Sequence, residues 1–265
     1  MGDSITADLP RDRPTDRAPA ADVLTEGRRL AGMFDGARIR ARLLGGVGIA
    51  LHAHGQIVAP FRRTYGDLDY VVHRSDAAAF RRILGANGYE ANERFNAVHG
   101  AKRLLFLDPE HERQVDVFVG TFRMCHVLEL NGRLTTPGPS LAPADLLLTK
   151  LQVVSLNEKD VVDSLMLLSE HEIGAEPEGV DPGRIAQILG HDWGWYTTVL
   201  DNLRKVAIHL NDLPDLEAEI RDRIRERLAA LQAFIDAAPK SLGWRSRSLV
   251  GRRLPWYELP EEVTR

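Results

Sequence analysis

The chain has little cysteine and no long apolar segment. Cys125 is the one cysteine in 265 residues, so an intramolecular disulfide is excluded and a reducing compartment is favoured. No apolar run approaches the roughly 20 residues that a membrane-spanning helix needs. The first 22 residues also lack the apolar centre of a signal peptide. These absences predict a cytoplasmic protein without a membrane partner.

The sequence also lacks an excess of charge of either sign. The formal net charge is −4 and the isoelectric point is about 6.2. This balance argues against a protein that holds nucleic acid by bulk charge alone, although it permits a local basic patch. With 44% apolar and 27% charged residues, the composition is that of a globular protein with one large or two modest domains.

The residue pattern divides the chain into four parts. Residues 1–21 are rich in Pro, Asp, Arg and Ala, which predicts a disordered tail. Strand-like and helix-like segments alternate over 22–140, which predicts a mixed β-sheet with helices packed on it. Helical periodicity dominates 141–238. Residues 239–265 form a basic tail, expected to be solvated or to touch a polyanion such as tRNA. The expected fold class is α+β, with an all-helical C-terminal domain.

Local signals place several elements in the first domain. We expect a helix over 22–34 and a strand over 38–44. Ser75 is a suitable N-cap for a helix that ends near residue 86. Residues 89–95 are predicted to be extended, as are "KRLLFLD" and "RQVDVFVG" further along the chain.

Three aspartates occupy strand-like segments, where carboxylates are rare. Asp67 and Asp69 lie in "GDLDYVV". Strand alternation places both on one face, while Leu68 and Tyr70 point to the packed side. Asp116 lies between two valines in "RQVDVFVG". If the two strands are neighbours, the three carboxylates converge. Hard oxygen ligands of this kind favour Mg²⁺, with Mn²⁺ as a second possibility, and suit two-metal phosphoryl transfer.

A glycine pair precedes these carboxylates. Gly45 and Gly46 lie between a predicted strand and a short helix, where backbone N–H groups and the helix dipole attract anions. The order of strand, glycine pair, helix and aspartate strand therefore predicts a triphosphate site. A plain strand-to-helix turn is the alternative interpretation.

The segments "LLGGVGIALHAHG", "RRTYGDLDYVV" and "RQVDVFV" together resemble the nucleotidyltransferase superfamily, whose fold is similar to the palm-like domain of DNA polymerase β. The block around "GGVGIAL" is similar to aminoglycoside and lincosamide adenylyltransferases. The segment "DLLLTKLQ…KDVVDSLMLL" looks more like the AbiEii-type toxins of type IV toxin–antitoxin systems.

The resemblance implies roles for individual residues. Asp67, Asp69 and Asp116 are the implied metal ligands and catalytic carboxylates, with Asp116 either a ligand or the base for the acceptor hydroxyl. The residues implied to bind the nucleotide are Gly45, Gly46, Arg63, Lys150, Asp160 and Asp163. The serine that often follows the first glycine in the superfamily is absent here.

The resemblance implies a Mg²⁺-dependent enzyme that moves a nucleoside monophosphate from an NTP to a hydroxyl. The acceptor stays open between an RNA end such as tRNA, a protein and a small molecule of the aminoglycoside or lincosamide type. A toxin of the AbiEii type would also have an antitoxin partner. The rivals are a catalytically silent nucleotide-binding member of the fold and a metal-dependent phosphohydrolase.

Overall fold

The computed structural model describes residues 18–135 and 138–259. Most of the predicted N-terminal tail, residues 1–17, lies outside the described residues, as does the end of the predicted C-terminal tail, residues 260–265. Within the described ranges, every helix is too short or too polar to cross a membrane.

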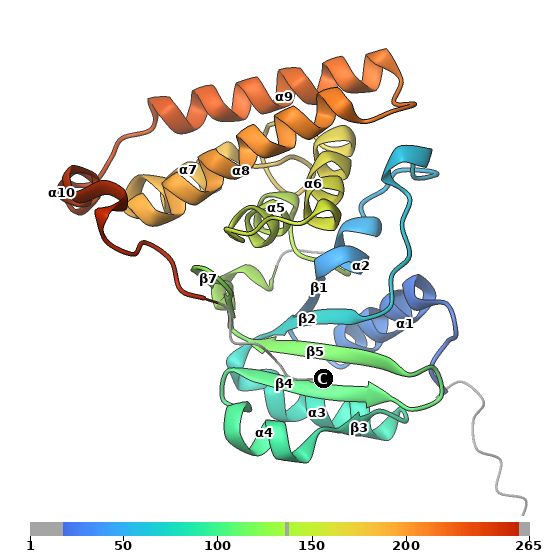
Figure 1. Ribbon diagram of the computed structural model, residues 1–265. Coiled ribbons are helices and arrows are strands. Elements are labelled where there is room, and N and C mark those ends of the chain that lie inside the picture. The colour runs from blue at the N-terminus through green and yellow to red at the C-terminus, as the bar shows by residue number, and fades with distance from the viewer. Residues whose placement is uncertain (1–17, 136–137, 260–265) are drawn as a thin grey trace, which may run out of the picture.

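A five-stranded sheet forms the base of the molecule, in the order β1-β2-β5-β4-β3 (Figure 1). Only β2 and β5 run parallel to each other; the other neighbouring pairs are antiparallel. The strands are β1 Ala41–Leu44, β2 Leu68–Val72, β3 Glu90–Ala91, β4 Arg103–Asp108 and β5 Arg113–Val119. A separate hairpin of β6 Thr121–Arg123 and β7 Val127–Glu129 follows. The mixed sheet confirms the predicted fold class.

One face of the sheet packs on helices from the first half of the chain. Its side chains include Leu68, Tyr70 and Val117, which are fully buried with Phe34 and Phe80. These phenylalanines come from α1 Val23–Gly36 and α3 Ala77–Ala86, which Figure 1 shows at the level of the strands, behind them. Because successive strand residues point to opposite faces, burial of these positions turns the intervening residues toward the other face.

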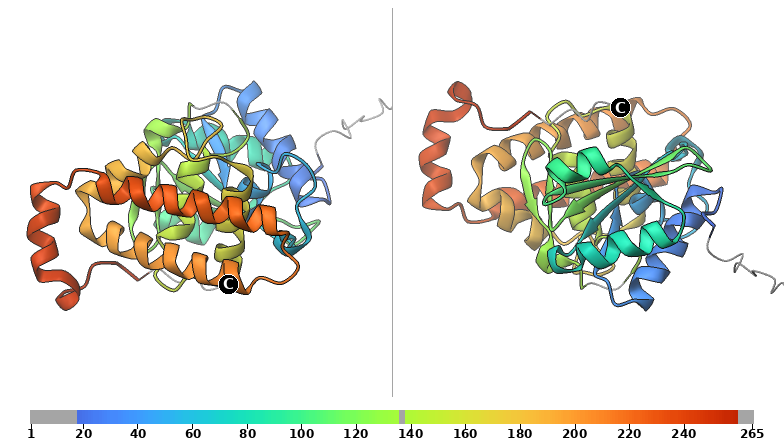
Figure 2. Two further views of the ribbon diagram at one scale, coloured as in Figure 1. Left: turned by 90° about the horizontal axis from the view of Figure 1, so that it is seen from above. Right: turned by 90° about the horizontal axis from the view of Figure 1, so that it is seen from below.

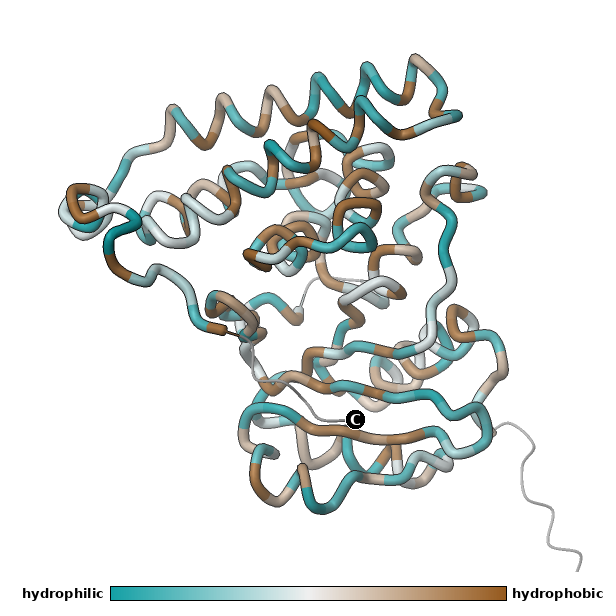
Figure 3. Tube along the Cα trace, in the orientation of Figure 1, coloured by the Kyte–Doolittle hydropathy of each residue, from teal (hydrophilic) through white to brown (hydrophobic). Residues whose placement is uncertain are grey.

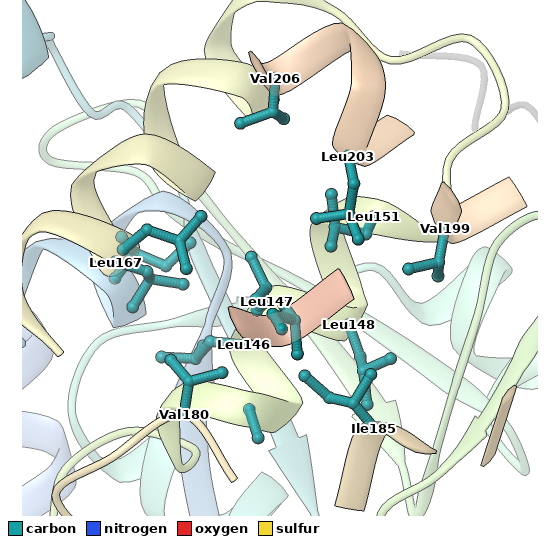
Figure 4. Close-up of a cluster of buried hydrophobic side chains, with 14 of the residues drawn as sticks. Leu146, Leu147, Leu148, Leu151, Leu167, Val180, Ile185, Val199, Leu203 and Val206 are labelled. Carbon is teal, nitrogen blue, oxygen red and sulfur yellow. The ribbon is translucent and has the colours of Figure 1, made fainter. Parts of the chain in front are cut away.

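The other face of the sheet meets the helical half of the chain. A continuous core joins Leu44, Val71 and Phe118 of the sheet to the helices above it. Figure 4 shows part of this core, with Leu147 and Leu148 of α5 facing Leu167 and Ile185. The helices are α2 Gly45–Ala50, α5 Pro143–Leu151, α6 Glu158–Glu170, α7 Pro182–His191, α8 Trp193–Asp212 and α9 Ala218–Ala237. The two halves thus share one core.

The longest helices, α8 and α9, lie side by side far from the sheet (Figures 1 and 2). Figure 3 shows apolar stretches in the sheet and in α5 and α6, and a more polar outer surface on α9. An apolar stripe on α9, formed by Ile224, Leu228 and Leu231, is buried. Burial of that stripe holds α9 on its own domain.

Three local predictions differ from the structure. Of residues 89–95, expected to be extended, 93–95 instead begin helix α4 Glu93–His99, because the Asn92 side chain accepts a hydrogen bond from the Phe95 N–H and caps its start. Ser75 does not cap α3: a 3-10 turn, Arg74–Asp76, precedes the helix. Within the expected solvated tail, Leu242–Val250 form helix α10.

Candidate active site

Two of the predicted carboxylates lie side by side on adjacent strands. Asp69 of β2 is the register partner of Asp116 on the parallel strand β5. Their neighbours Leu68, Tyr70 and Val117 are buried against α1 and α3, so both aspartates point to the opposite face. Asp116 is only 6% exposed and Asp69 is half-buried. The expected convergence of positions 69 and 116 is therefore present.

The Asp69 carboxyl group is in an unfavourable environment for a negative charge. Burial, followed by the nearby Asp116 carboxylate, raises the pKa of Asp69 to about 7, although Lys150 opposes the shift. Asp67 contributes a smaller repulsion from an exposed position just before β2. Two adjacent carboxylates, one of which raises the pKa of the other, are well placed for a shared cation.

Arg103 holds the Asp116 carboxylate in place. Its Nε donates to Asp116 Oδ1 at 2.8 Å, and Nη2 donates to Oδ2. The same guanidinium lies 5.0 Å from the ring centroid of Phe118. Sequence reasoning missed Arg103, because only the pairing of β4 with β5 brings it opposite this part of the strand. The available signal was Asp116 itself, because a buried carboxylate in a strand is costly unless a cationic group pairs with it.

The glycine pair is packed tightly against charged side chains. Gly45 has a positive φ of 65°, and a Cβ there would lie 2.0 Å from Asp69 Oδ2. A Cβ on Gly46 would lie 1.8 Å from Nη2 of Arg63. Both glycines belong to α2, which has only six residues, so the structure supports close approach more directly than a helix dipole. No other residue type fits these positions without displacing the charged groups.

The predicted nucleotide-binding residues form one ion-pair network. Arg63 donates from Nε and Nη2 to the two oxygens of Asp163, at 2.8 and 2.7 Å. Lys150 Nζ lies 2.9 Å from both Asp160 Oδ1 and Asp163 Oδ2. Burial alone would lower the pKa of Lys150, but these carboxylates outweigh it and raise that pKa. Helices α5 and α6 thus hold two cations beside the glycine pair and Asp69.

Tyr65 was not predicted and completes this side of the site. The Arg63 guanidinium lies 4.4 Å from the centre of its ring, and the ring approaches Gly46. The Tyr65 hydroxyl is buried and has no hydrogen-bond partner among the described residues. A buried hydroxyl beside Arg63 is available to a bound ligand.

The donor set is of the kind that Mg²⁺ binds, but it is not assembled as a complete metal site. Asp69 and Asp116 present their carboxylate oxygens on the same face of the sheet. Within residues 18–135 and 138–259, no group of three or more His, Cys, Asp or Glu side chains is arranged to hold a metal ion. Arg103 already occupies the Asp116 carboxylate. Magnesium binding, and the predicted metal role of Asp67, are therefore carried forward as proposals.

A family model described as an uncharacterised nucleotidyltransferase matches residues 5–171. The chain belongs to this family. The match includes every residue of the site described above and ends where α6 ends, so the nucleotidyltransferase has a further helical segment, α7 to α10, outside the matched region. The predicted family and enzyme class are confirmed.

The solved structures that match include two distant likenesses. The lincosamide antibiotic adenylyltransferase LnuA, with lincomycin bound, is 16% identical, covers 51% of this chain and 90% of its own, and has a TM-score of 0.38. An antigenic nucleotidyltransferase-like protein from Paracoccidioides brasiliensis is 16% identical, covers 84% of this chain and 96% of its own, and has a TM-score of 0.41. Neither likeness is close enough to carry an inference about substrate. A search of curated proteins finds no match.

Proposed function

We propose that the nucleotidyltransferase moves a nucleoside monophosphate from an NTP to an acceptor hydroxyl in a Mg²⁺-dependent reaction. The observation that carries this proposal is the pairing of Asp69 with Asp116 directly beside Gly45. Two facing carboxylates, a glycine turn and held cations are the parts that phosphoryl transfer requires.

The triphosphate is assigned to the side of the site that contains Gly46. There the backbone has no side chain, and Arg63 and Lys150 are fixed by Asp163. Cations held in position bind phosphate oxygens without first losing side-chain freedom. The hydroxyl of Tyr65 is a further donor for the bound nucleotide.

Asp69 and Asp116, with Asp67 at the edge, are the proposed ligands for Mg²⁺ or Mn²⁺. When bound, the ion would neutralise the carboxylates and the triphosphate charge and polarise the reacting phosphoryl group. We propose Asp116 as either a ligand of the ion or the base that accepts the proton of the acceptor hydroxyl. The acceptor oxygen then bonds to the α-phosphorus, the bond from that phosphorus to the bridging oxygen breaks, and pyrophosphate leaves with the electron pair.

The resemblance leaves the acceptor open between RNA, protein and a small molecule. The pairing of Lys150 with Asp160 and Asp163 lies in the segment that resembles AbiEii-type toxins, so a toxin with an antitoxin partner stays a prediction.

Intact pairing of Asp69 with Asp116 argues against a catalytically silent relative, which has no need to keep two repelling carboxylates together.

The released product distinguishes transfer from hydrolysis. The protein should be incubated with Mg²⁺, each α-labelled NTP and a cell extract, and pyrophosphate and inorganic phosphate should be measured separately. Transfer predicts pyrophosphate together with label on an acceptor. Free phosphate or free NMP without a labelled acceptor would indicate a phosphohydrolase and contradict the proposal.

A further inference from the structure

A cavity opens beside Arg103, the residue whose guanidinium holds Asp116. Its volume is about 370 Å³, which is within the range of small-molecule sites. It is formed by the start of β4, the end of β5, the β6–β7 hairpin and residues 258–259. The lining residues used below are Arg74, Lys102, Arg103, Phe118, Arg123 and Glu258.

The cavity has an excess of positive charge. Four of its lining residues are cationic, whereas Glu129 and Glu258 are its two acids. Arg74 and Lys102 are exposed, and neither side chain forms an ion pair within the described ranges. Such unpaired cations around a hollow attract anions.

One carboxylate of the chain itself already binds at the rim. Glu258 Oε2 lies 2.7 Å from Nη1 of Arg123, and the Glu258 N–H donates to the Cys125 carbonyl at 2.9 Å. Figure 1 shows this C-terminal segment running from α10 to β7. The ion pair of Glu258 with Arg123 therefore shows that the rim of the cavity accommodates a carboxylate group.

Arg103 connects the cavity to the proposed chemistry. It lines the cavity, and its guanidinium holds both oxygens of Asp116. Only the Arg103 side chain therefore links a molecule in the cavity to Asp116, the group proposed to take the acceptor proton. The triphosphate is assigned to the surroundings of Gly46 and Arg63, neither of which lines this cavity, so the cavity is left for the second substrate.

We infer that this cavity is the acceptor subsite and that the acceptor is a small hydroxyl compound carrying a phosphate or carboxylate group. Arg74 and Lys102 bind the anionic group, and the hydroxyl points to Asp116. A small acceptor is favoured over a polymer because Glu258 and Leu259 cover one side of the cavity. The cationic lining disfavours a polycationic aminoglycoside. This inference rests on the proposed transfer reaction.

The test fractionates the acceptors before the reaction. A cell extract is divided into acidic small molecules, neutral and cationic small molecules, RNA, and protein, and each fraction is incubated with α-labelled NTP and Mg²⁺. Wild type is compared with the Arg74→Gln/Lys102→Gln double variant. The control is Arg81→Gln/Arg82→Gln, which removes two equally exposed arginines from α3. NTP binding is measured separately by calorimetry.

We expect label in the acidic small-molecule fraction, as a product heavier by one nucleoside monophosphate. The Arg74→Gln/Lys102→Gln variant should need about tenfold or more of that fraction for half-maximal transfer, because two charge-assisted contacts are lost. Its affinity for NTP should be unchanged, and the control should match wild type.

Label in the neutral, cationic, RNA or protein fraction would overturn the inference while leaving nucleotidyl transfer intact. Equal transfer by the double variant would overturn it as well. NTP binding without label in any fraction would reject an acceptor subsite. Failure of the wild type to bind NTP would instead reject the proposed function, and with it the inference that rests on it.

Discussion

The carboxylate of Asp163 is shared by two buried or half-buried cations, and its removal is the most direct test of how the site is held. Asp163 is 1% exposed. It accepts two hydrogen bonds from Arg63 and lies 2.9 Å from Lys150 Nζ. In Asp163→Ala these cations lose their common anion but stay in a partly desolvated position.

The size of the effect follows from burial. Breaking a buried ion pair by removing one partner costs about 3–5 kcal/mol, because an uncompensated charge remains. At about 2–4 °C per kcal/mol, this corresponds to a fall in Tm of roughly 6–20 °C. Asp163→Asn keeps the volume and one acceptor oxygen, so its cost should be smaller, about 2 kcal/mol.

Urea unfolding of the wild type and both variants would measure these costs. The matched control is Asp222→Ala, which removes an exposed partner of Arg225 and should change stability by less than about 0.5 kcal/mol. If Asp163→Ala cost no more than the control, Asp163 would not be the anion that fixes Arg63 and Lys150. The same variant should also bind NTP more weakly, since Arg63 would no longer be fixed beside Gly46.

Two further predictions concern the backbone and pH. Gly45→Ala should lower stability by about 1–2 kcal/mol, since alanine is strained at a φ of 65° and its Cβ meets Asp69; Gly32→Ala, in open space on α1, should be neutral or stabilising in the same urea assay. Burial lowers the pKa of His52 and of His126 to about 4. The unfolded chain therefore binds protons that the folded chain does not, and stability present above pH 6.5 should fall between pH 6.5 and 4, by up to about 3 kcal/mol for each histidine. The raised pKa of Asp69 acts in the opposite direction in this window, so urea unfolding at several pH values should be done with the Asp69→Asn variant, where stability that rose on acidification would contradict the prediction.

Local pattern and spacing predicted much of the site. The alternation of Leu68 and Tyr70 with Asp69 indicated which face of β2 is buried, and a lone carboxylate in β5 indicated a neighbouring polar position. Both signals follow from the alternation of side chains along a single strand, so they can be read from the sequence without knowledge of the fold. The family resemblance added Lys150 and Asp163, which the ion-pair network brings together.

Other features depend on contacts between distant segments. Arg103 meets Asp116 only because β4 pairs antiparallel with β5. The hydroxyl of Tyr65 is buried by the loop path after α2, and no periodicity marks it. Helix α10 was missed because its basic residues suggest a solvated tail, whereas Ser241 caps it by accepting from the Trp244 N–H.

Calorimetric titration of NTP into the wild type and an Asp69→Asn variant, with and without Mg²⁺, tests the central claim most directly. The amide keeps the volume of the side chain beside Gly45 but removes its charge. We predict Mg²⁺-dependent binding to the wild type and at least a tenfold loss in the variant, since about 1.4 kcal/mol of metal-mediated binding suffices for that change. Equal binding by both proteins, or binding to the wild type that ignores Mg²⁺, would contradict a metal site at Asp69 and Asp116.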